Sequence, residues 1–366
     1  MFIKIRAEQR MTIMNRRTRT SKVLMFLLVA TITMSIAFAG SDKRRGTAGA
    51  QELLIPVGSV GTAMGGSYSA VISGIEAAYW NPAGVAILEG NGEAIFSHMN
   101  YIADINVEYA GIASRVGSMG VIGATLKTID FGEIPVTTTE DTDGTGEYYS
   151  PRYMTIGLLF SKIMTDRINF GVKLNLISEQ IMRVSASGVA LNAGVQYRTA
   201  ADGFMMGVTL RNLGTDMLFT GADLEQTITP PLTEPGTRDE PWRIPLSSFE
   251  LPTQLEIAIA YGLYHNGGTK VTVGGAFLND NFSLDQYTFG AEIEFMDMVY
   301  LRGSYAFAED PETHEFYSGN EEFLWSSGLG FGLKLNMGST NFKIDYAMRP
   351  SYLFSTNSWL SFRVGF

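Results

Sequence analysis

Three histidines decide whether this sequence can form a hydrolytic site. His98 lies in a stretch of alternating apolar residues, whereas His265 and His314 lie in segments expected to be turns or loops. A serine hydrolase needs an imidazole held beside a serine hydroxyl. Ser97 directly precedes His98, but adjacent residues of a strand point to opposite faces, so the two side chains are badly placed to interact. We therefore expect no catalytic residues.

A group of acidic residues at 140–147 is the other candidate for chemistry, through binding of calcium. Glu140, Asp141, Asp143 and Glu147 supply carboxylates, but their spacing lacks the further ligands of a 12-residue calcium loop. A solvated outer loop explains the same residues and is the interpretation we favour. The chain has no cysteine, which excludes a thiolate zinc site. We expect no metal and no cofactor.

The composition narrows the class of protein. Of 366 residues only 17% are charged, whereas soluble chains have about a quarter. The 37 Asp and Glu outnumber the 27 Lys and Arg, and this argues against a nucleic-acid partner because neutralising phosphates needs clustered basic residues. With 45% hydrophobic residues, the chain is expected to be a large all-β domain or a membrane protein.

The amino terminus predicts export from the cytoplasm. A basic stretch that includes Arg16 and Arg17 precedes an apolar run over 23–38, and Ala39 supplies a small residue for cleavage. This order is typical of a secretory signal peptide, so we expect residues 1–39 to be cleaved. An amino-terminal membrane anchor and a twin-arginine signal are the alternatives, although the run is short for a span of about 20 residues.

Removal of residues 1–39 makes the chain more acidic. This segment holds seven Lys or Arg and one acidic residue, which leaves 20 basic and 36 acidic residues and a net charge of −16. Met11 or Met14 is an alternative start within it. No later segment approaches 18 uninterrupted apolar residues, so we expect no transmembrane helix in the exported chain.

Beyond residue 93, apolar residues alternate with small or polar ones. Ile156 and Leu158, for example, alternate with Thr155 and Gly157. Because side chains of a strand point alternately to its two faces, one face is apolar and the other small or polar. A soluble β-sandwich has the same alternation, so this pattern alone does not identify a membrane protein.

The lengths of the connections identify the type of sheet. Every second connection is tight, and the long ones, 131–151, 214–251 and 309–322, all fall on the other side. An even number of antiparallel strands with this sorting is the layout of a transmembrane barrel. We predict a 14-stranded antiparallel transmembrane β-barrel over residues 93–366, in contact with lipid of a bacterial outer membrane. The expected strands are 94–103, 105–116, 119–130, 152–164, 167–179, 187–198, 204–213, 252–263, 269–279, 284–296, 298–308, 323–337, 341–350 and 357–366.

The last strand has an apolar face that ends on the terminal aromatic residue. Phe362, Val364 and Phe366 share this face, and Ser361 and Arg363 lie on the other. Such a strand resembles the insertion signal of bacterial outer-membrane barrels, which implies recognition by the barrel assembly machinery. An ordinary edge strand is the alternative, but an exposed apolar edge promotes aggregation, whereas pairing with the first strand removes both edges.

Residues 40–92 do not resemble strands and are rich in small residues. A short helix is expected before Pro56, and Tyr79-Trp80-Asn81-Pro82-Ala83-Gly84 forms a distinctive run. Asn before Pro favours a turn, in which the Asn side chain caps the backbone. We predict that this segment is a hatch or plug inside the barrel, packed against a glycine-lined wall.

The run over 53–86, followed by fourteen strands, resembles the PorV/PorQ family of outer-membrane proteins. That family belongs to the wider group of barrels similar to the fatty-acid transporter FadL, whose hatch carries an Asn-Pro-Ala turn that matches Asn81, Pro82 and Ala83. Tyr79 and Trp80 match the preceding family positions. The resemblance implies a non-enzymatic accessory of type IX-like protein secretion or surface attachment, with outer loops that bind secreted cargo proteins.

A FadL-like channel for uptake of hydrophobic small molecules is the alternative function. The proline-rich segment 214–251 is the expected partner surface, with Trp242 and Phe249 as anchors, although it equally suits a cover over the barrel mouth. A structure that distinguishes a sealed lumen from an apolar tunnel would separate the two functions. An outer-membrane enzyme ranks third because no Ser/His/Asp arrangement is present.

Overall fold

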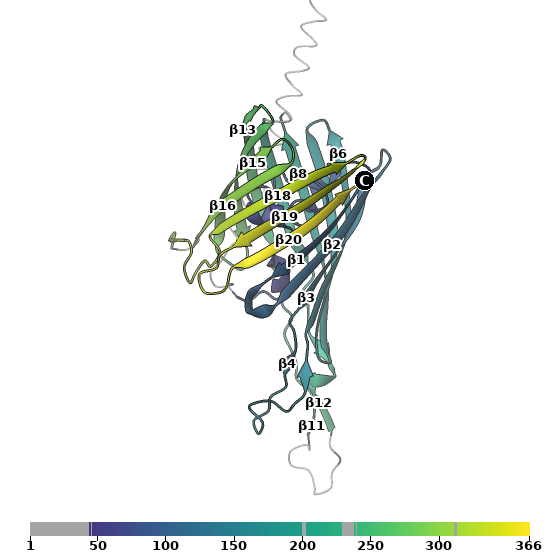
Figure 1. The fold of residues 1–366 in the computed structure, drawn as a ribbon. Coiled ribbons are helices and arrows are strands. Elements are labelled where there is room, and N and C mark those ends of the chain that lie inside the picture. Colours follow the sequence, from purple (N-terminus) through teal and green to yellow (C-terminus); the bar gives the residue numbers. More distant parts are fainter. Residues whose placement is uncertain (1–43, 45, 200–202, 229–237, 239, 311–312) are drawn as a thin grey trace, which may run out of the picture. The chain divides into compact units, whose positions relative to one another are not determined.

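The computed structural model describes residues 44, 46–199, 203–228, 238, 240–310 and 313–366, and Figure 1 shows their arrangement. The expected signal peptide, 1–39, lies outside the described residues. The chain divides into the units Met1–Gly40 and Ser41–Phe366, and the second contains everything discussed below. No helix within the described residues is both long and apolar enough to cross a membrane.

Fourteen antiparallel strands close into a barrel. The first, β1, pairs with the last, β20, so that Ser97 lies opposite Ser361. Every strand of the ring therefore has a neighbour on both sides, as the sequence predicts, and the backbone hydrogen bonds are made within the sheet. The barrel strands are β1 (Gly92–Asn100), β2 (Asn106–Val116), β3 (Gly120–Asp130), β6 (Arg152–Thr165), β7 (Ile168–Ile181), β8 (Val184–Arg198), β9 (Phe204–Gly214), β13 (Gln254–Asn266), β14 (Thr269–Asp280), β15 (Asp285–Phe295), β16 (Val299–Glu309), β18 (Ser327–Met337), β19 (Thr340–Arg349) and β20 (Asn357–Gly365).

The two faces of the sheet differ as the alternation predicts. Ile156 and Leu158 of β6 point outward and are exposed, whereas Thr155 and Ser161 point into the lumen and are buried. The last strand follows the same rule, with Phe362 outward and Arg363 inward. An apolar outer band around a closed barrel is what a membrane-spanning protein of the bacterial outer membrane requires.

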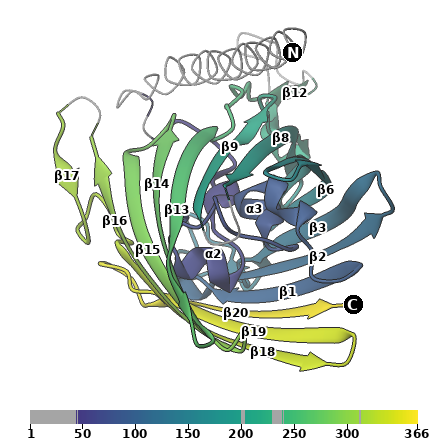
Figure 2. The ribbon, with the colours of Figure 1, turned by 90° about the horizontal axis from the view of Figure 1, so that it is seen from above.

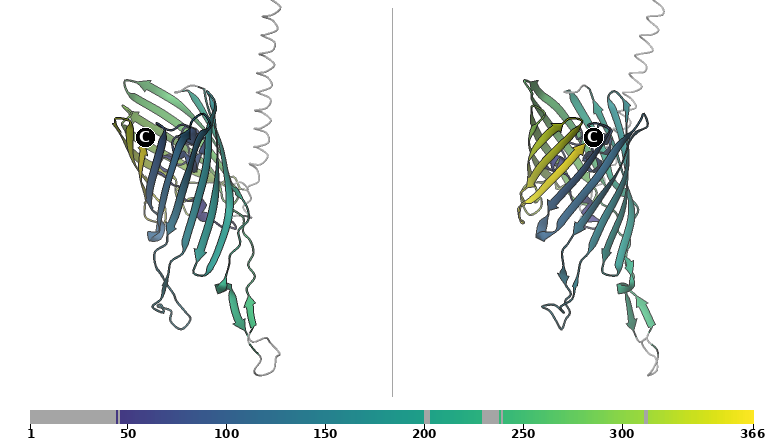
Figure 3. Two further views of the ribbon diagram at one scale, coloured as in Figure 1. Left: turned by 90° about the vertical axis from the view of Figure 1, so that its right-hand side faces the viewer. Right: turned by 45° about the vertical axis from the view of Figure 1, so that its right-hand side comes forward.

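The tight turns and the long connections lie at opposite ends of the barrel (Figure 3). Short strands extend the long connections beyond the rim of the barrel. They are β4 (Ile134–Pro135) with β5 (Tyr148–Tyr149), β11 (Glu225–Ile228) with β12 (Glu240–Arg243), β10 (Thr220–Gly221) beside β8, and β17 (Phe316–Tyr317) beside β16. Two short helices also lie in these connections, η4 (Ile102–Asp104) and η5 (Ala222–Leu224).

The described segment before β1 contains four short helices, and Figure 2 shows two of them, α2 (Ser59–Ala63) and α3 (Ala77–Trp80), inside the ring of strands. The other two are η2 (Gln51–Leu54) and η3 (Pro82–Ala86). We call residues 46–91 the hatch. Its side chains Val60, Met64, Ile75 and Val85 are buried in one cluster with wall residues such as Tyr109. The hatch thus supplies the hydrophobic core that a barrel of this size otherwise lacks.

Glycines on the inner wall make room for the hatch. A Cβ atom at Gly171 of β7 would lie 2.3 Å from the carbonyl carbon of Pro82, and one at Gly194 of β8 would lie 2.0 Å from Oδ1 of Asn81. Gly328 and Gly330 of β18 face the α2 end of the hatch in the same way. The predicted glycine lining therefore has a steric cause, the close approach of hatch backbone to the wall.

Gly171→Ala tests this packing against the matched change Gly303→Ala on the outer face, where a Cβ atom would lie 3.6 Å from Leu329 Cδ2. We expect Gly171→Ala to lower the free energy of unfolding by about 1–3 kcal/mol through overpacking. Gly303→Ala should leave it unchanged or raise it by about 0.5 kcal/mol, since Ala restricts the unfolded chain. Urea unfolding in lipid vesicles measures both, and equal losses would contradict the close hatch contact.

Candidate functional site

Asn81 and Pro82 connect two helices of the hatch to the wall. Asn81 Oδ1 accepts a hydrogen bond from the Ala83 backbone N–H at 3.1 Å, and so caps η3, whose first residue is Pro82. Asn81 Nδ2 donates to the carbonyl oxygens of Ser69 at 3.1 Å and of Val195 in β8 at 3.2 Å. Both polar atoms of the Asn81 side-chain amide therefore have hydrogen-bond partners within the protein, as expected for a completely buried amide.

Tyr79 and Trp80 form hydrogen bonds to the backbone of residues 53–57, in the first part of the hatch. Tyr79 donates its hydroxyl proton to the Leu53 carbonyl at 3.1 Å, and Trp80 Nε1 donates to the Val57 carbonyl at 3.0 Å. The two rings meet edge to face with centroids 5.2 Å apart. Burial raises the pKa of Tyr79 to about 12, so its hydroxyl stays protonated and remains a donor. Ala83 and Gly84 are buried beside them.

A buried ionic network joins the other side of the hatch to the wall. Glu76 accepts hydrogen bonds from the backbone N–H groups of Val60 and Gly61, at 2.8 and 3.0 Å, and lies 3.7 Å from Arg363. Arg363 in turn contacts Asp345 at 2.9 Å. Burial raises the pKa of Glu76, and the charge of Arg363 opposes this shift. Ion pairs and backbone contacts therefore fix the hatch at several points.

An apolar chamber of about 490 Å³ lies between the hatch and the long-loop end of the barrel. Its floor is the hatch segment 47–52, which we call the strap. Its aromatic walls come from four separate segments, and Phe131 and Tyr153 meet edge to face with centroids 4.9 Å apart. The lining residues are Thr47, Ala48, Gly49, Ala50, Gln51, Glu52, Ile55, Tyr101, Ile105, Ile129, Phe131, Tyr153, Glu179, Phe219 and Phe249.

Lys127 of β3 fastens the strap to the wall. Its Nζ donates to the carbonyl oxygens of Glu52 and Ile55, both at 2.6 Å. The Glu52 carboxyl adjoins that of Glu179 of β7 at the edge of the apolar chamber. Burial raises the pKa of Glu52, with Lys127 acting in the opposite direction. Lys127 thus fastens one end of the strap, and the Gly49 N–H donates to the Glu250 carbonyl at 3.1 Å nearer the other end.

A second chamber, of about 410 Å³, has mixed polar and aromatic walls. Arg211 and Glu256 form a buried ion pair of 2.7 Å in its wall. Tyr101 stacks on Trp325 there, with ring centroids 6.1 Å apart. Gln51, Ile55 and Tyr101 line both chambers, so these side chains form the partition between them. We call this space the mixed chamber.

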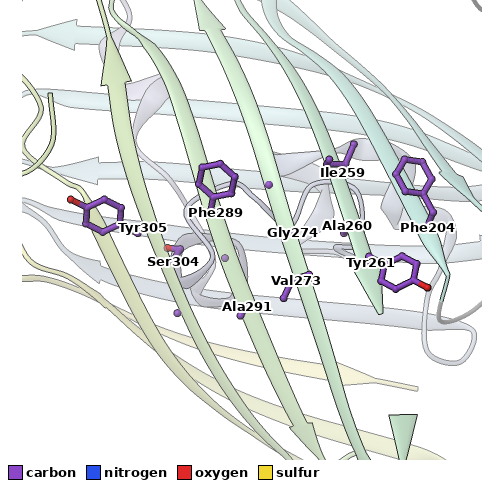
Figure 4. A pocket seen from close by; sticks show the side chains of 13 residues that line it. Phe204, Ile259, Ala260, Tyr261, Val273, Gly274, Phe289, Ala291, Ser304 and Tyr305 are labelled. Carbon is purple, nitrogen blue, oxygen red and sulfur yellow. The ribbon is translucent and has the colours of Figure 1, made fainter. Parts of the chain in front are cut away.

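A groove of about 610 Å³ lies in the outer wall across β9 and β13–β16, and Figure 4 shows its side chains. Tyr261, Phe289 and Tyr305 project around it and are half exposed, while Val273 and Ala291 lie between them. This surface belongs to the apolar outer band of the barrel, where lipid chains cover it. The groove is therefore separate from the two chambers in the lumen.

The two aromatic anchors expected in segment 214–251 lie in different surroundings. Trp242 of β12 is 50% exposed on the projecting hairpin. Phe249 instead packs on the strap, where only glycine fits, because a Cβ atom at Gly49 would lie 1.9 Å from its ring. A β-bridge with Met217 fixes this position. Phe249 is therefore a chamber wall and no exposed anchor, since its loop folds back over the mouth.

Sequence reasoning did not single out the residues that form the apolar chamber. Lys127 and Glu179 were not named among the expected site residues, and Glu52 was included only in the short helix expected before Pro56. The alternation along β3 and β7 places Lys127 and Glu179 on the lumen face. This could have indicated a site, since a charged residue on that face needs a partner in the lumen. In the described part of the chain no group of three His, Asp or Glu is arranged so that it could hold a metal ion.

Lys127→Met tests whether this cation fastens the strap, with Lys162→Met on the outer face of β6 as the control. We expect Lys127→Met to leave the barrel closed but to speed amide hydrogen exchange of residues 50–56, because two hydrogen bonds to backbone carbonyls are lost. Lys162→Met should leave that segment protected. Equal protection in both variants, measured by mass spectrometry, would show that the strap does not depend on Lys127.

Comparison with known proteins identifies only the fold. No family model matches the chain, and no curated protein matches it in sequence. The toluene transporter TodX of Pseudomonas putida matches in structure with a TM-score of 0.51 at 13% identity, over 84% of this chain and 96% of TodX. A deltaS2S3 mutant of TodX, a monoaromatic hydrocarbon channel, matches with a TM-score of 0.51 at 13% identity. The match covers 84% of this chain and 97% of the mutant.

The toluene transporter TbuX of Ralstonia pickettii gives a TM-score of 0.48 at 13% identity, over 85% of this chain and 98% of TbuX. At such identities the likeness to TodX establishes a shared barrel architecture and nothing further. It agrees with the FadL-like part of the resemblance drawn from the sequence. None of the comparisons supports the PorV/PorQ part. The chain therefore has the fold of the outer-membrane hydrocarbon channels.

Proposed function

We propose that this protein is a conduit of the bacterial outer membrane that takes up small apolar solutes. One observation carries the proposal: an apolar chamber of about 490 Å³ lies inside a membrane barrel, at its long-loop end and directly above a packed hatch. Ligand sites of this kind are concave and mainly apolar, with a few polar groups that orient the ligand. The shared fold with TodX, a toluene transporter, supports the same reading.

The secretion role implied by the PorV/PorQ resemblance has weaker support. It needs an exposed surface that receives cargo, and of its two expected anchors only Trp242 is exposed. Phe249 contributes to the chamber instead. We retain as a proposal that the outward residues Phe362, Val364 and Phe366 are read by the barrel assembly machinery. The terminal carbonyl of Phe366 also accepts backbone hydrogen bonds from Asn91 and Gly92, at 2.8 and 2.9 Å.

Filling the apolar chamber tests the conduit directly. Ala48→Trp places a large ring in the strap beneath Phe131 and Tyr153, and we expect it to reduce uptake of labelled toluene to the rate of cells without the protein. Thr137→Trp adds the same ring to the exposed loop 131–151 and should leave uptake unchanged. Undiminished uptake by correctly assembled Ala48→Trp would refute the chamber as the entry site.

A crosslink between hatch and wall tests whether solutes must displace the hatch. Ser59 Oγ of α2 lies 2.8 Å from Ser361 Oγ of β20, and the chain has no native cysteine. The pair Ser59→Cys and Ser361→Cys is therefore placed to form a disulfide. We expect the oxidised double variant to lose toluene uptake and a reductant to restore it. Each single variant should be insensitive to reductant. Full uptake through the oxidised double variant would exclude a moving hatch.

A further inference from the structure

Two buried carboxyl groups at the edge of the apolar chamber have three oxygen atoms without a hydrogen-bond donor in the part of the chain that the structure describes. Glu52 of η2 is 6% exposed and Glu179 of β7 is 3% exposed. Within the described residues, no hydrogen-bond donor reaches either carboxylate oxygen of Glu52 or Oε1 of Glu179. A buried carboxylate without a partner is costly. This pair is therefore a site for a donor or a cation that comes from outside the chain.

Lys127 does not fill this role, although it is close. Its Nζ is bonded to the backbone carbonyls of Glu52 and Ile55, so these hydrogen bonds go to the hatch backbone and not to either carboxyl group. Its one positive charge offsets one of the two carboxylates. Adjacent carboxylates do not both ionise readily without further compensation, so a second positive charge placed beside Glu52 and Glu179 would favour the ionised form of both.

The rest of the chamber suits an organic cation better than a metal ion. No third carboxylate or imidazole joins Glu52 and Glu179 to form a ligand set among the described residues. The walls instead present aromatic faces, including the Phe131–Tyr153 pair and Phe219 beside Phe249 with centroids 5.6 Å apart. Aromatic faces attract ammonium groups, and together with aliphatic side chains they accommodate an apolar body.

We propose that the apolar chamber selects solutes that join an apolar body to a protonated amine. The ammonium head binds at Glu52 and Glu179, and the body lies against Phe131, Tyr153 and Phe249. Carboxylic acids of the same shape are rejected, because their charge repels the acid pair. This inference rests on the proposed uptake of apolar solutes and specifies which of them bind most tightly.

Four probes that share a 4-butylphenyl group and differ only in the head group distinguish binding by the head group from binding by the apolar body. They are 4-butylbenzylamine, 4-butylbenzyl alcohol, 4-butylbenzoate and 4-butyltoluene, titrated at pH 7 by calorimetry into the full barrel in nanodiscs. Empty nanodiscs correct for partition into lipid. We expect the amine to bind about tenfold more tightly than the alcohol, as a charge-assisted hydrogen bond predicts, and the benzoate to bind least.

Glu179→Gln should remove the preference for the amine while binding of 4-butyltoluene persists. Glu52→Gln provides a second, independent variant in case the first does not assemble. Glu225→Gln removes an equivalent charge from the exposed β11 and should keep the preference, which controls for a general effect of surface charge.

The results separate this inference from the proposed function. If the hydrocarbon, alcohol and amine bind the wild-type barrel within about twofold of one another, the acid pair selects nothing and the inference is overturned, while the conduit stands. Retention of the amine preference in both glutamine variants would overturn it as well. If no probe binds beyond the empty nanodiscs, the inference and the conduit both fail.

Discussion

The pairing of β1 with β20 is the constraint on which the rest of the structure depends. A sheet in lipid cannot leave backbone N–H and C=O groups unpaired, and closing the ring is the only way to satisfy those of the edge strands. Closure fixes which residues face inward, because side chains alternate strictly along each strand. Once the outer face is apolar, the buried polar and charged side chains of the strands gather in the lumen. That crowding determines how the hatch is held.

The hatch meets this polar wall mainly through its backbone. Lys127 bonds to two hatch carbonyls, Asn81 links Ser69 to β8, and Glu76 accepts two backbone N–H groups of α2. Glycines such as Gly171 permit the close approach that these bonds need. The apolar chamber and the mixed chamber lie next to the strap and the long connections.

The sequence was sufficient to predict the barrel but not the site. Strand alternation and the sorting of connections predicted all fourteen strands, because both follow from local periodicity and the geometry of a closed sheet. β18 begins at Ser327, later than the expected 323, since the residues before it belong to a long connection without the sheet pattern. The small residues around Asn81 indicated a packed hatch for a comparable local reason.

The apolar chamber depends on contacts that no local pattern records. Glu52 and Glu179 are 127 positions apart, and they meet only because the strap crosses the lumen beside β7. Phe249 was expected either to anchor a partner or to belong to a cover over the barrel mouth, and the sequence does not indicate its bridge to Met217 or its contact with Gly49. The path of a long connection is decided by such tertiary contacts, so its residues are hard to assign from composition.

The partition formed by Gln51, Ile55 and Tyr101 gives the two chambers a thermodynamic connection. A solute that moves Tyr101 in one chamber also changes the wall of the other, where this ring stacks on Trp325. An occupant of the apolar chamber that displaces this shared ring would therefore change the affinity of the mixed chamber for its own occupant. Such coupling is reciprocal, so each occupant changes the affinity of the other by the same factor.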